Sequence, residues 1–249
     1  MATNGVNGIN GINGAAGGSP DDFIDKIIDM PDDYLYERIR PMTDLRKDPG
    51  EGRILYLCNQ QPLDAELGSM AHSAKEKLVL KVKAQWPGPQ NLIHKGPSPM
   101  TEAELKVLQK FGDENVLGVP HLITWKKAKQ GPDGIHPGGY IIYTVMTKVP
   151  GESLWDIGYW SMDSSQRAEI QQIFLKKLRQ IRKLGIAPYD CALRNVLWDK
   201  HSKQVGIVDF EHYHETTEPI ENEKEELQRW GLVQRPPPGT WHTEWFMHQ

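Results

Sequence analysis

The chain has 249 residues, of which 38% are hydrophobic and 25% charged, and its formal net charge is −4. This length supports one large domain or two lobes, and no apolar run approaches the roughly 18 residues of a membrane-spanning helix. We therefore expect a protein without a membrane span and without overall attraction to nucleic acid. The two cysteines, Cys58 and Cys191, lie far apart in apolar surroundings, which predicts buried reduced thiols and a cytoplasmic location.

The N-terminal residues predict a tail followed by helices. Residues 1–19 are rich in Asn-Gly pairs, which favour turns and are costly to order, and they lack the basic start and apolar stretch of a signal peptide. We expect this tail to be disordered. From Ser19 and Pro20 onwards, early acids and apolar residues at helical spacing predict one or two short leading helices.

The next part of the chain predicts four strands and one helix. GRILYLCN (52–59) and KLVLKVKAQW (77–86) are β-rich, and alternation in the second run places Val79, Lys81 and Lys83 on one face. SPMTEAELKVLQKFG (98–112) has the cap residues and apolar spacing of an amphipathic helix. VPHLITWKKA (119–128) and GGYIIYTVMTKV (138–149) predict two further strands, separated by a turn-rich segment.

The second half of the chain is predicted to be more helical. Residues 164–185 form its longest periodic segment, and NVLWD (195–199) with QVGIVDF (204–210) predicts a hairpin beneath this helix. An acidic helix and the Pro-rich RPPPGTW (235–241) follow. The long helix also carries a basic cluster, which is either a solvated face or a contact for phosphate or RNA. Its members are Lys176, Lys177, Arg179, Arg182 and Lys183.

Three polar residues near the hairpin predict a metal site. Asp190 precedes one apolar segment, Asn195 follows five positions later, and Asp209 ends the next segment. Carboxylate and amide oxygens suit a hard cation such as magnesium, although the same residue types also form turns and caps. In phosphoryl transfer, Asp190 would orient or deprotonate the acceptor, Asn195 and Asp209 would bind the metal, and Lys81 would reach the nucleotide phosphates.

Over roughly residues 50–215, these motifs resemble the protein-kinase-like fold, and more closely its aminoglycoside phosphotransferase and choline kinase branch. VLKVK resembles the third-strand lysine motif, and TEAELKVLQKF resembles the helix whose Glu pairs with that lysine. YIIYTVMTKVPGESL resembles the hinge strand, and YDCALRNVLWD with VGIVDFE resembles the catalytic loop and metal motif. The resemblance implies a two-lobed α+β fold, with a small antiparallel sheet in an N-terminal lobe (20–149) and a reduced, mainly helical C-terminal lobe (150–249).

The resemblance also implies ATP and magnesium as cofactors and a set of site residues. Lys83 is an alternative to Lys81 as the phosphate-binding lysine, and Glu102 is an alternative to Glu104 as its partner. The implied catalytic residues are Lys81, Glu104, Asp190 and Arg194; Lys81, Met146 and Lys148 contact the nucleotide, Asn195 and Asp209 hold the metal, and Glu211 belongs to the same site.

The chain departs from the family pattern at four places. CNQQPLDAELGSMAHSAKEK (58–77), where we expect the loop over the phosphates, has only Gly68 and no G-x-G pattern. Pro188 stands where the catalytic loop usually carries His, and Glu211 follows the DF pair where Gly is usual, as in some fungal relatives. About forty residues follow the metal motif, so the acceptor site must be reduced, built differently or completed by a partner.

Three functions therefore remain open. The first is an ATP- and magnesium-dependent phosphotransferase acting on a hydroxyl or amine of a small molecule. The second is a kinase-like scaffold repurposed for aminoacyl transfer in fungal secondary metabolism, similar to arginine-containing cyclodipeptide synthases. Such an enzyme would use aminoacyl-tRNA, bind it through the Lys176 to Lys183 face and need no ATP. The third is a pseudokinase that serves as a binding module.

Overall fold

The computed structural model describes residues 23–48, 50–63, 78–88, 90–94 and 96–233. The predicted disordered tail (1–19) and the Pro-rich segment 235–241 lie outside these residues. No helix within the described ranges is long and apolar enough to cross a membrane.

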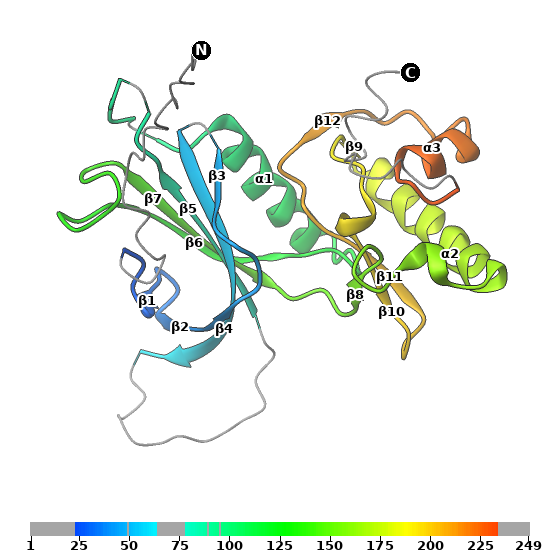
Figure 1. The fold of residues 1–249 in the computed structure, drawn as a ribbon, viewed down its shortest axis with the longest axis horizontal. Helices are drawn as coiled ribbons and strands as arrows, with labels where there is room; N and C mark the ends of the chain where they lie inside the picture. Colours follow the sequence, from blue (N-terminus) through cyan, green and yellow to red (C-terminus); the bar gives the residue numbers. More distant parts are fainter. Residues whose placement is uncertain (1–22, 49, 64–77, 89, 95, 234–249) are drawn as a thin grey trace, which may run out of the picture.

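The first part of the molecule is an antiparallel sheet (Figure 1). The order of its hydrogen-bonded strands is β1-β2-β4-β5-β7-β6, and β3 pairs with β4. β5 is the central strand for the site, and its eight residues are all buried between β4 and β7. The strands are β1 (Ile27–Asp29), β2 (Tyr34–Pro41), β3 (Arg46–Asp48), β4 (Glu51–Pro62), β5 (Leu78–Gln85), β6 (Leu122–Lys129) and β7 (Tyr140–Thr147).

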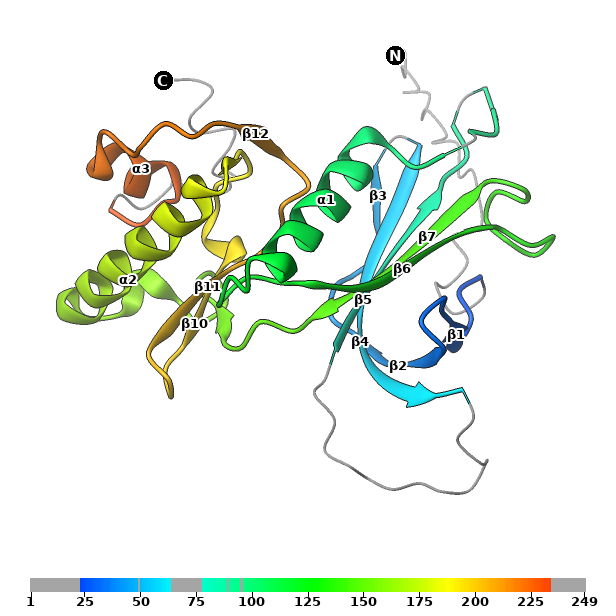
Figure 2. The same ribbon diagram turned by 180° about the vertical axis from the view of Figure 1, so that it is seen from behind.

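One helix, α1 (Pro99–Asp113), lies beside this sheet and faces the rest of the chain (Figures 1 and 2). Ser98 caps its N-terminus by accepting a hydrogen bond from the backbone N–H of Thr101. Its apolar face packs in two directions, because Leu108 contacts Val79 and Met146 of the sheet whereas Phe111 belongs to the core of the second part. This helix therefore ties the two parts together.

The second part is smaller and richer in helix. Its core packs α2 (Ser164–Lys183) against short strand pairs, with Phe174 and Trp230 in edge-to-face contact. β10 pairs with β11 and β8, and β9 pairs with β12, all antiparallel. The elements are β8 (Glu152–Ser153), η2 (Tyr159–Ser161), α2, β9 (Ile186–Pro188), η3 (Leu193–Asn195), β10 (Val196–Asp199), β11 (Gln204–Ile207), β12 (Tyr213–Glu215) and α3 (Glu223–Arg229).

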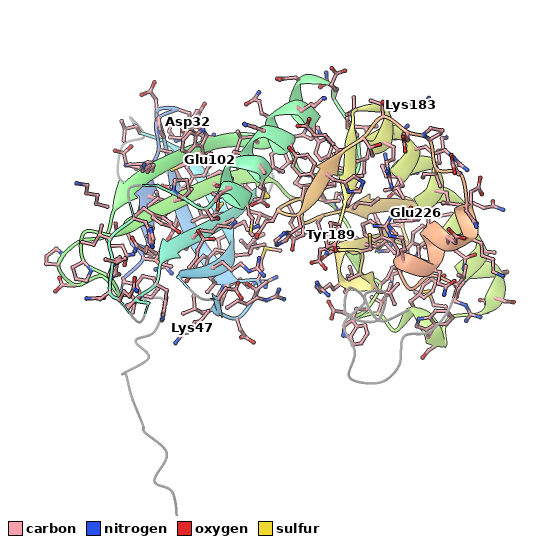
Figure 3. All side chains as sticks on the ribbon, turned by 90° about the horizontal axis from the view of Figure 1, so that it is seen from above. Asp32, Lys47, Glu102, Lys183, Tyr189 and Glu226 are labelled. Atoms are coloured by element: carbon pink, nitrogen blue, oxygen red, sulfur yellow. The ribbon has the colours of Figure 1, made fainter. Side chains whose placement is uncertain are left out.

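The two-lobed α+β architecture predicted from the sequence is confirmed. The apolar residues form one core within the sheet and a second core around α2, and Figure 3 shows side chains of both parts, with Lys47 and Glu102 on the first and Lys183 and Glu226 on the second. The predicted helices at 98–112 and 164–185 are present as α1 and α2, and the predicted hairpin is formed by β10 and β11.

The predicted leading helices are wrong, because residues 27–29 and 34–41 form β1 and β2. Pro31 and Asp33, whose φ is 62°, form a turn between the strands that a helix does not accommodate. Burial along β2 is greatest at Tyr36 and Arg38, two residues apart, which is strand periodicity. The sheet contacts of β2 with β4 outweigh the helical spacing that the acids and apolar residues suggest locally.

We expect Gly151→Ala to destabilise the protein by about 2 kcal/mol, because the backbone there has a left-handed conformation. Gly151 has a φ of 103°, and an added Cβ would lie 2.7 Å from the carbonyl carbon of Trp198 and 2.8 Å from the amide nitrogen of Asp199. Urea unfolding measures the loss. Gly88→Ala is the matched control, since its Cβ would meet no atom within 4 Å. Equal stability of the two variants would contradict this account of the turn between β7 and β8.

The two cysteines are free and buried, as the sequence predicts. Burial raises the pKa of each thiol to about 12, so that at pH 8 only about one thiol in 10,000 is ionised. We therefore expect Cys58 and Cys191 to resist a thiol reagent at pH 8 in the folded protein and to react fully in urea. Rapid reaction of either cysteine without denaturant would contradict this burial.

Candidate functional site

A buried ion pair joins β5 to α1. Lys81 is 5% exposed and donates hydrogen bonds to both carboxylate oxygens of Glu104, at 2.8 and 3.0 Å. Glu104 is buried on the face of α1 that turns toward the sheet, whereas Glu102 is exposed. The structure therefore brings together the predicted Lys81 and Glu104.

The alternative lysine, Lys83, also lies inside the protein, and it is 2% exposed. Its ammonium donates a hydrogen bond to the hydroxyl of Thr101 at 2.9 Å and lies 3.8 Å from Glu104 and 3.7 Å from Glu51. Burying an ammonium is costly unless it is paired, and these contacts supply the partners. Lys83 is thus a second cation of the same cluster and not a solvated strand residue.

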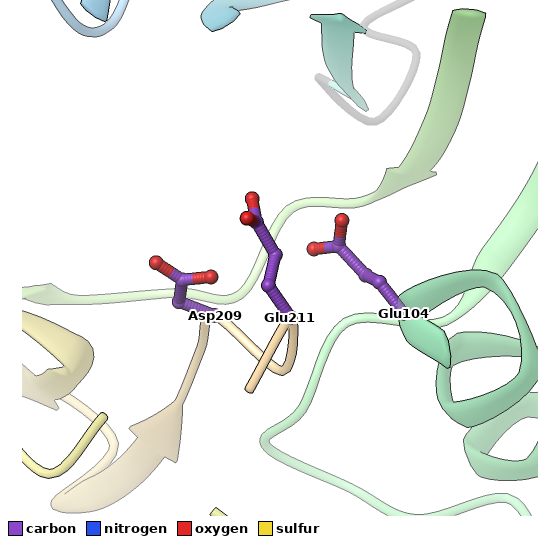
Figure 4. A group of neighbouring side chains, drawn as sticks. All are labelled: Glu104, Asp209 and Glu211. Atoms are coloured by element: carbon purple, nitrogen blue, oxygen red, sulfur yellow. The ribbon is translucent and has the colours of Figure 1, made fainter. Parts of the chain in front are cut away.

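Glu211 links the second part of the molecule to the sheet. Its carboxylate pairs with Lys81, lies 3.3 Å from Lys83 and accepts a hydrogen bond of 2.7 Å from Arg53 on β4. Sequence reasoning missed Arg53, because the residue with which it pairs lies 158 positions away and no local pattern announces the contact. In the view of Figure 4, Glu211 lies between Asp209 and Glu104.

The charges of this cluster depend on one another. Burial alone would lower the pKa of Lys81, but the carboxylates of Glu104, Glu211 and Asp209 raise it above its usual value. Burial raises the pKa of Glu104 in spite of the neighbouring lysines. For Glu211, burial is outweighed by Lys81, Lys83 and Arg53, which together lower the pKa of its carboxyl. Lys81 is therefore charged and opposed by an ionised Glu211.

The predicted catalytic loop runs from β9 to β10. Arg194 donates hydrogen bonds to both oxygens of Asp190, at 2.6 and 2.7 Å, and so fixes the direction of that carboxylate. The amide of Asn195 donates to the backbone oxygen of Asp190 at 2.9 Å and to its carboxylate at 3.3 Å. Asp190 is therefore held by two neighbours from its own loop, and Tyr189 beside it is 51% exposed.

Asp209 lies at the end of β11, in a strained conformation with φ of 67°. The loop that carries it is tied to the catalytic loop, because Val208 N–H donates to the backbone oxygen of Asn195 at 2.9 Å. Asp209 Oδ1 is buried and accepts no hydrogen bond from the described residues, although it lies 4.0 Å from the ammonium of Lys81. A buried carboxylate oxygen left in this way points to a cation as its missing partner.

The donor set fits a magnesium ion. Oxygen atoms of Glu104, Asp209 and Glu211 lie within 4.8 Å of one another, and Asn195 adds an amide oxygen on the adjoining loop. Glu104 and Glu211 are engaged with lysines, which leaves Asp209 and Asn195 as the available ligands. Asp209 and Asn195, which the sequence predicts as metal ligands, both line the same cavity, and binding of a metal ion by them stays a prediction.

A cavity of about 450 Å³ contains most of the predicted site. This volume is in the range of small-molecule sites. Asp190 is absent from its lining but is hydrogen-bonded to two residues that line it. The predicted residues that line the cavity are Lys81, Glu104, Met146, Lys148, Arg194, Asn195, Asp209 and Glu211.

The cavity is not lined by the segment that the sequence predicts as its phosphate loop. Met42, Thr43 and Arg46, between β2 and β4, line the cavity, whereas none of the described residues of 58–63 does. The rest of the expected segment, residues 64–77, lies outside the described residues. The sequence analysis predicts helices where β1 and β2 lie, so it takes β4 as the first strand of the sheet. The predicted loop therefore falls at and after the end of β4, over 58–77.

A larger cavity, of about 730 Å³, lies elsewhere on the sheet and includes Arg38, Tyr56 and Tyr143. The side chain of Arg38 is occupied there, since it donates hydrogen bonds to the backbone oxygens of Ile24 and Asp25 and lies over the ring of Tyr56. The described residues that line this cavity include neither of the predicted metal ligands and no lysine–carboxylate ion pair. Its size alone does not make it the better candidate.

The basic cluster of α2 does not form one continuous exposed face. Lys177 is buried, burial lowers its pKa, and its ammonium donates to the backbone oxygen of Leu117. Arg179 pairs with Glu223, and Arg182 lies 3.5 Å from Glu226, both on α3. Lys176 and Lys183 are exposed. Acidic residues of α3 thus neutralise part of the cluster, and binding of tRNA to it stays a prediction.

No family model and no curated protein matches this sequence. Among solved structures, the chain is similar to the kinase PK-1 of the Cydia pomonella granulovirus, with 16% identity and a TM-score of 0.46. The match covers 72% of this chain and 52% of the viral kinase, so the chain spans about half the length of that protein. A likeness at this level says nothing about activity, which must be argued from the site itself.

Proposed function

We propose that the protein is an ATP- and magnesium-dependent phosphotransferase that acts on a hydroxyl or amine of a small molecule. The observation that carries this proposal is the meeting, at one cavity, of a buried Lys81–Glu104 pair with two loops that contribute Asp209 and Asn195. A cation for phosphate, ligands for a hard metal ion and a fixed carboxylate are the parts that phosphoryl transfer requires.

The chain's own residues divide the work as follows. Lys81, held by Glu104, would neutralise phosphate charge, whereas Asp209 and Asn195 would hold the metal ion. The ion supplies further neutralisation of the phosphates. Asp190, fixed by Arg194, orients the acceptor and accepts the proton that its hydroxyl or amine loses.

The base of a bound nucleotide would lie along the chain that leaves β7. Met146 and Lys148 line the cavity there, and the apolar side chain of Leu55 lines it from β4. Apolar contacts on both faces of the base, with few polar groups, are typical of small-molecule sites. The phosphates then extend toward Lys81 and Asp209.

The direct test is the search for an acceptor with Mg·ATP and a panel of small hydroxyl- and amine-containing molecules. Phosphorylated product is detected by mass spectrometry, and Asp190→Asn is run in parallel. We expect ADP and a phosphorylated acceptor from the unchanged protein only. Product that forms without ATP, from aminoacyl-tRNA, would replace this proposal by aminoacyl transfer. No consumption of ATP and no bound nucleotide would favour a pseudokinase binding module.

A further inference from the structure

The carboxylate of Glu211 is surrounded by three cations from two neighbouring strands. Arg53 Nη1 lies 2.7 Å and Lys83 Nζ 3.3 Å from Glu211 Oε2, and Lys81 contacts Oε1. Arg53 on β4 and Lys83 on β5 are directly opposite in the strand register. Like charges at opposite positions of a sheet repel each other, so an anion between them is required.

Glu211 is the shared anion of this cluster. Within the described part of the chain, it is the one carboxylate that contacts all three cations, whereas Glu104 contacts the two lysines and not Arg53. The cations come from two neighbouring strands inside the sheet, whereas Glu211 belongs to the loop between β11 and β12. The cations and the anion are therefore carried by different elements.

Two of the three cations line the cavity of the proposed nucleotide site, and the third lies behind them. Arg53 and Lys81 line the same cavity as Asp209, and the Arg53 side chain is 22% exposed. Segment 58–77 contains one glycine and no G-x-G pattern, and the G-x-G pattern that is present, Gly50 to Gly52 at the turn from β3 to β4, does not line this cavity, so its described lining has no Gly-rich backbone cradle for phosphate. Side-chain donors are the alternative, and the planar fork of an Arg matches the oxygens of a phosphate.

We propose that Arg53, Lys81 and Lys83 form a side-chain site for the polyphosphate of the nucleotide, and that Glu211 is an internal anion displaced when phosphate binds. This inference rests on the proposed phosphotransferase function and assigns two cations, Arg53 and Lys83, to substrate binding. Arg53 contacts the phosphate, whereas the nearly inaccessible Lys83 adds charge behind it. Glu211 keeps the cations together without ligand and weakens binding by competing for them.

The test measures binding of inorganic tripolyphosphate by calorimetry in the presence of EDTA, so that no metal ion contributes. Glu211→Gln removes the competing charge and is expected to tighten binding about tenfold, which is the size of one charged hydrogen bond. Arg53→Gln is expected to weaken binding about tenfold for the same reason. Unchanged or weaker binding by Glu211→Gln would overturn the displacement, and unchanged binding by Arg53→Gln would overturn the contact.

Two controls keep these results interpretable. Arg179→Gln and Glu223→Gln break an exposed Arg–Glu pair outside the cavity and should leave tripolyphosphate binding unchanged. If Glu211→Gln fails to fold, as judged by circular dichroism, tripolyphosphate binding by Arg53→Gln is the deciding measurement. Equal or tighter binding would show that Arg53 only holds Glu211, whereas weaker binding is expected if Arg53 contacts phosphate.

The outcome for the wild type with Mg·ATP separates this inference from the proposed function. Turnover of Mg·ATP with no difference among the variants in tripolyphosphate binding would preserve the function and overturn the inference. Tighter tripolyphosphate binding by Glu211→Gln, without any consumption of ATP by the wild type, would support the anion site and contradict the phosphotransferase.

Discussion

Lys81→Met is expected to abolish phosphoryl transfer and to destabilise the fold by about 3–5 kcal/mol, the usual cost of removing one partner from a buried ion pair. The change removes one of the two lysines that Glu104 and Glu211 share, and both carboxylates are buried. Urea unfolding measures the stability, and turnover of Mg·ATP measures the activity.

The double variant Lys81→Met/Glu104→Gln separates the two effects. The second substitution removes the buried negative charge of Glu104 and should recover part of the lost stability. It should recover no activity, because the lysine that contacts phosphate is still missing. Arg179→Met breaks the exposed pair with Glu223 and serves as a control, with an expected cost below about 1 kcal/mol. Full activity of Lys81→Met would remove this lysine from the site.

Asp190→Asn is expected to lower turnover by about 100-fold or more and to leave Mg·ATP binding intact. The carboxylate orients the acceptor and takes its proton, a contribution usually worth 10²–10⁴-fold. Asn retains one oxygen for Arg194, and Asp190 does not line the cavity, so the nucleotide site is preserved. Kinetics and calorimetry on the same preparation measure the two properties.

Asp199→Asn is the matched control for this change. Asp199 is the last residue of β10, does not line the cavity, and accepts hydrogen bonds from Ser202 and from the backbone of His201. The variant should keep wild-type turnover. Equal turnover of Asp190→Asn and Asp199→Asn would show that the carboxylate of Asp190 has no part in the reaction.

The sequence predicts the parts of the site that lie within short motifs. Val79, Lys81 and Lys83 alternate along one face of a strand, and Glu104 has the helical spacing of an inward-facing position, so that contact between a lysine and Glu104 follows once the helix packs on that face of the sheet. Asp190 and Asn195 lie five positions apart in one loop. Local spacing and the resemblance to the kinase-like fold therefore single out these four side chains, with Lys83 and Glu102 left as alternatives to Lys81 and Glu104.

Two other features depend on contacts that a sequence pattern does not contain. Arg53 belongs to the site because it meets Glu211, which comes from the far end of the chain. Residues 27–41 become strands because β2 pairs with β4, and this tertiary pairing overrides a local pattern that suits a helix. The mistaken helices also shift the expected loop over the cavity to 58–77, whereas Met42, Thr43 and Arg46 line that cavity. Errors in the site thus follow from an error in strand pairing.

The measurement that tests the central claim most directly is a thermal-shift titration of the wild type and Asp209→Ala with Mg·ATP. At about 100 times the Kd, binding adds about 2.7 kcal/mol and raises the Tm of a chain of this size by roughly 5–10 °C. We predict this rise for the wild type, its dependence on magnesium and its loss in Asp209→Ala. An unchanged Tm of the wild type at millimolar Mg·ATP, or an equal rise in both proteins, would contradict a nucleotide–metal site built on Asp209.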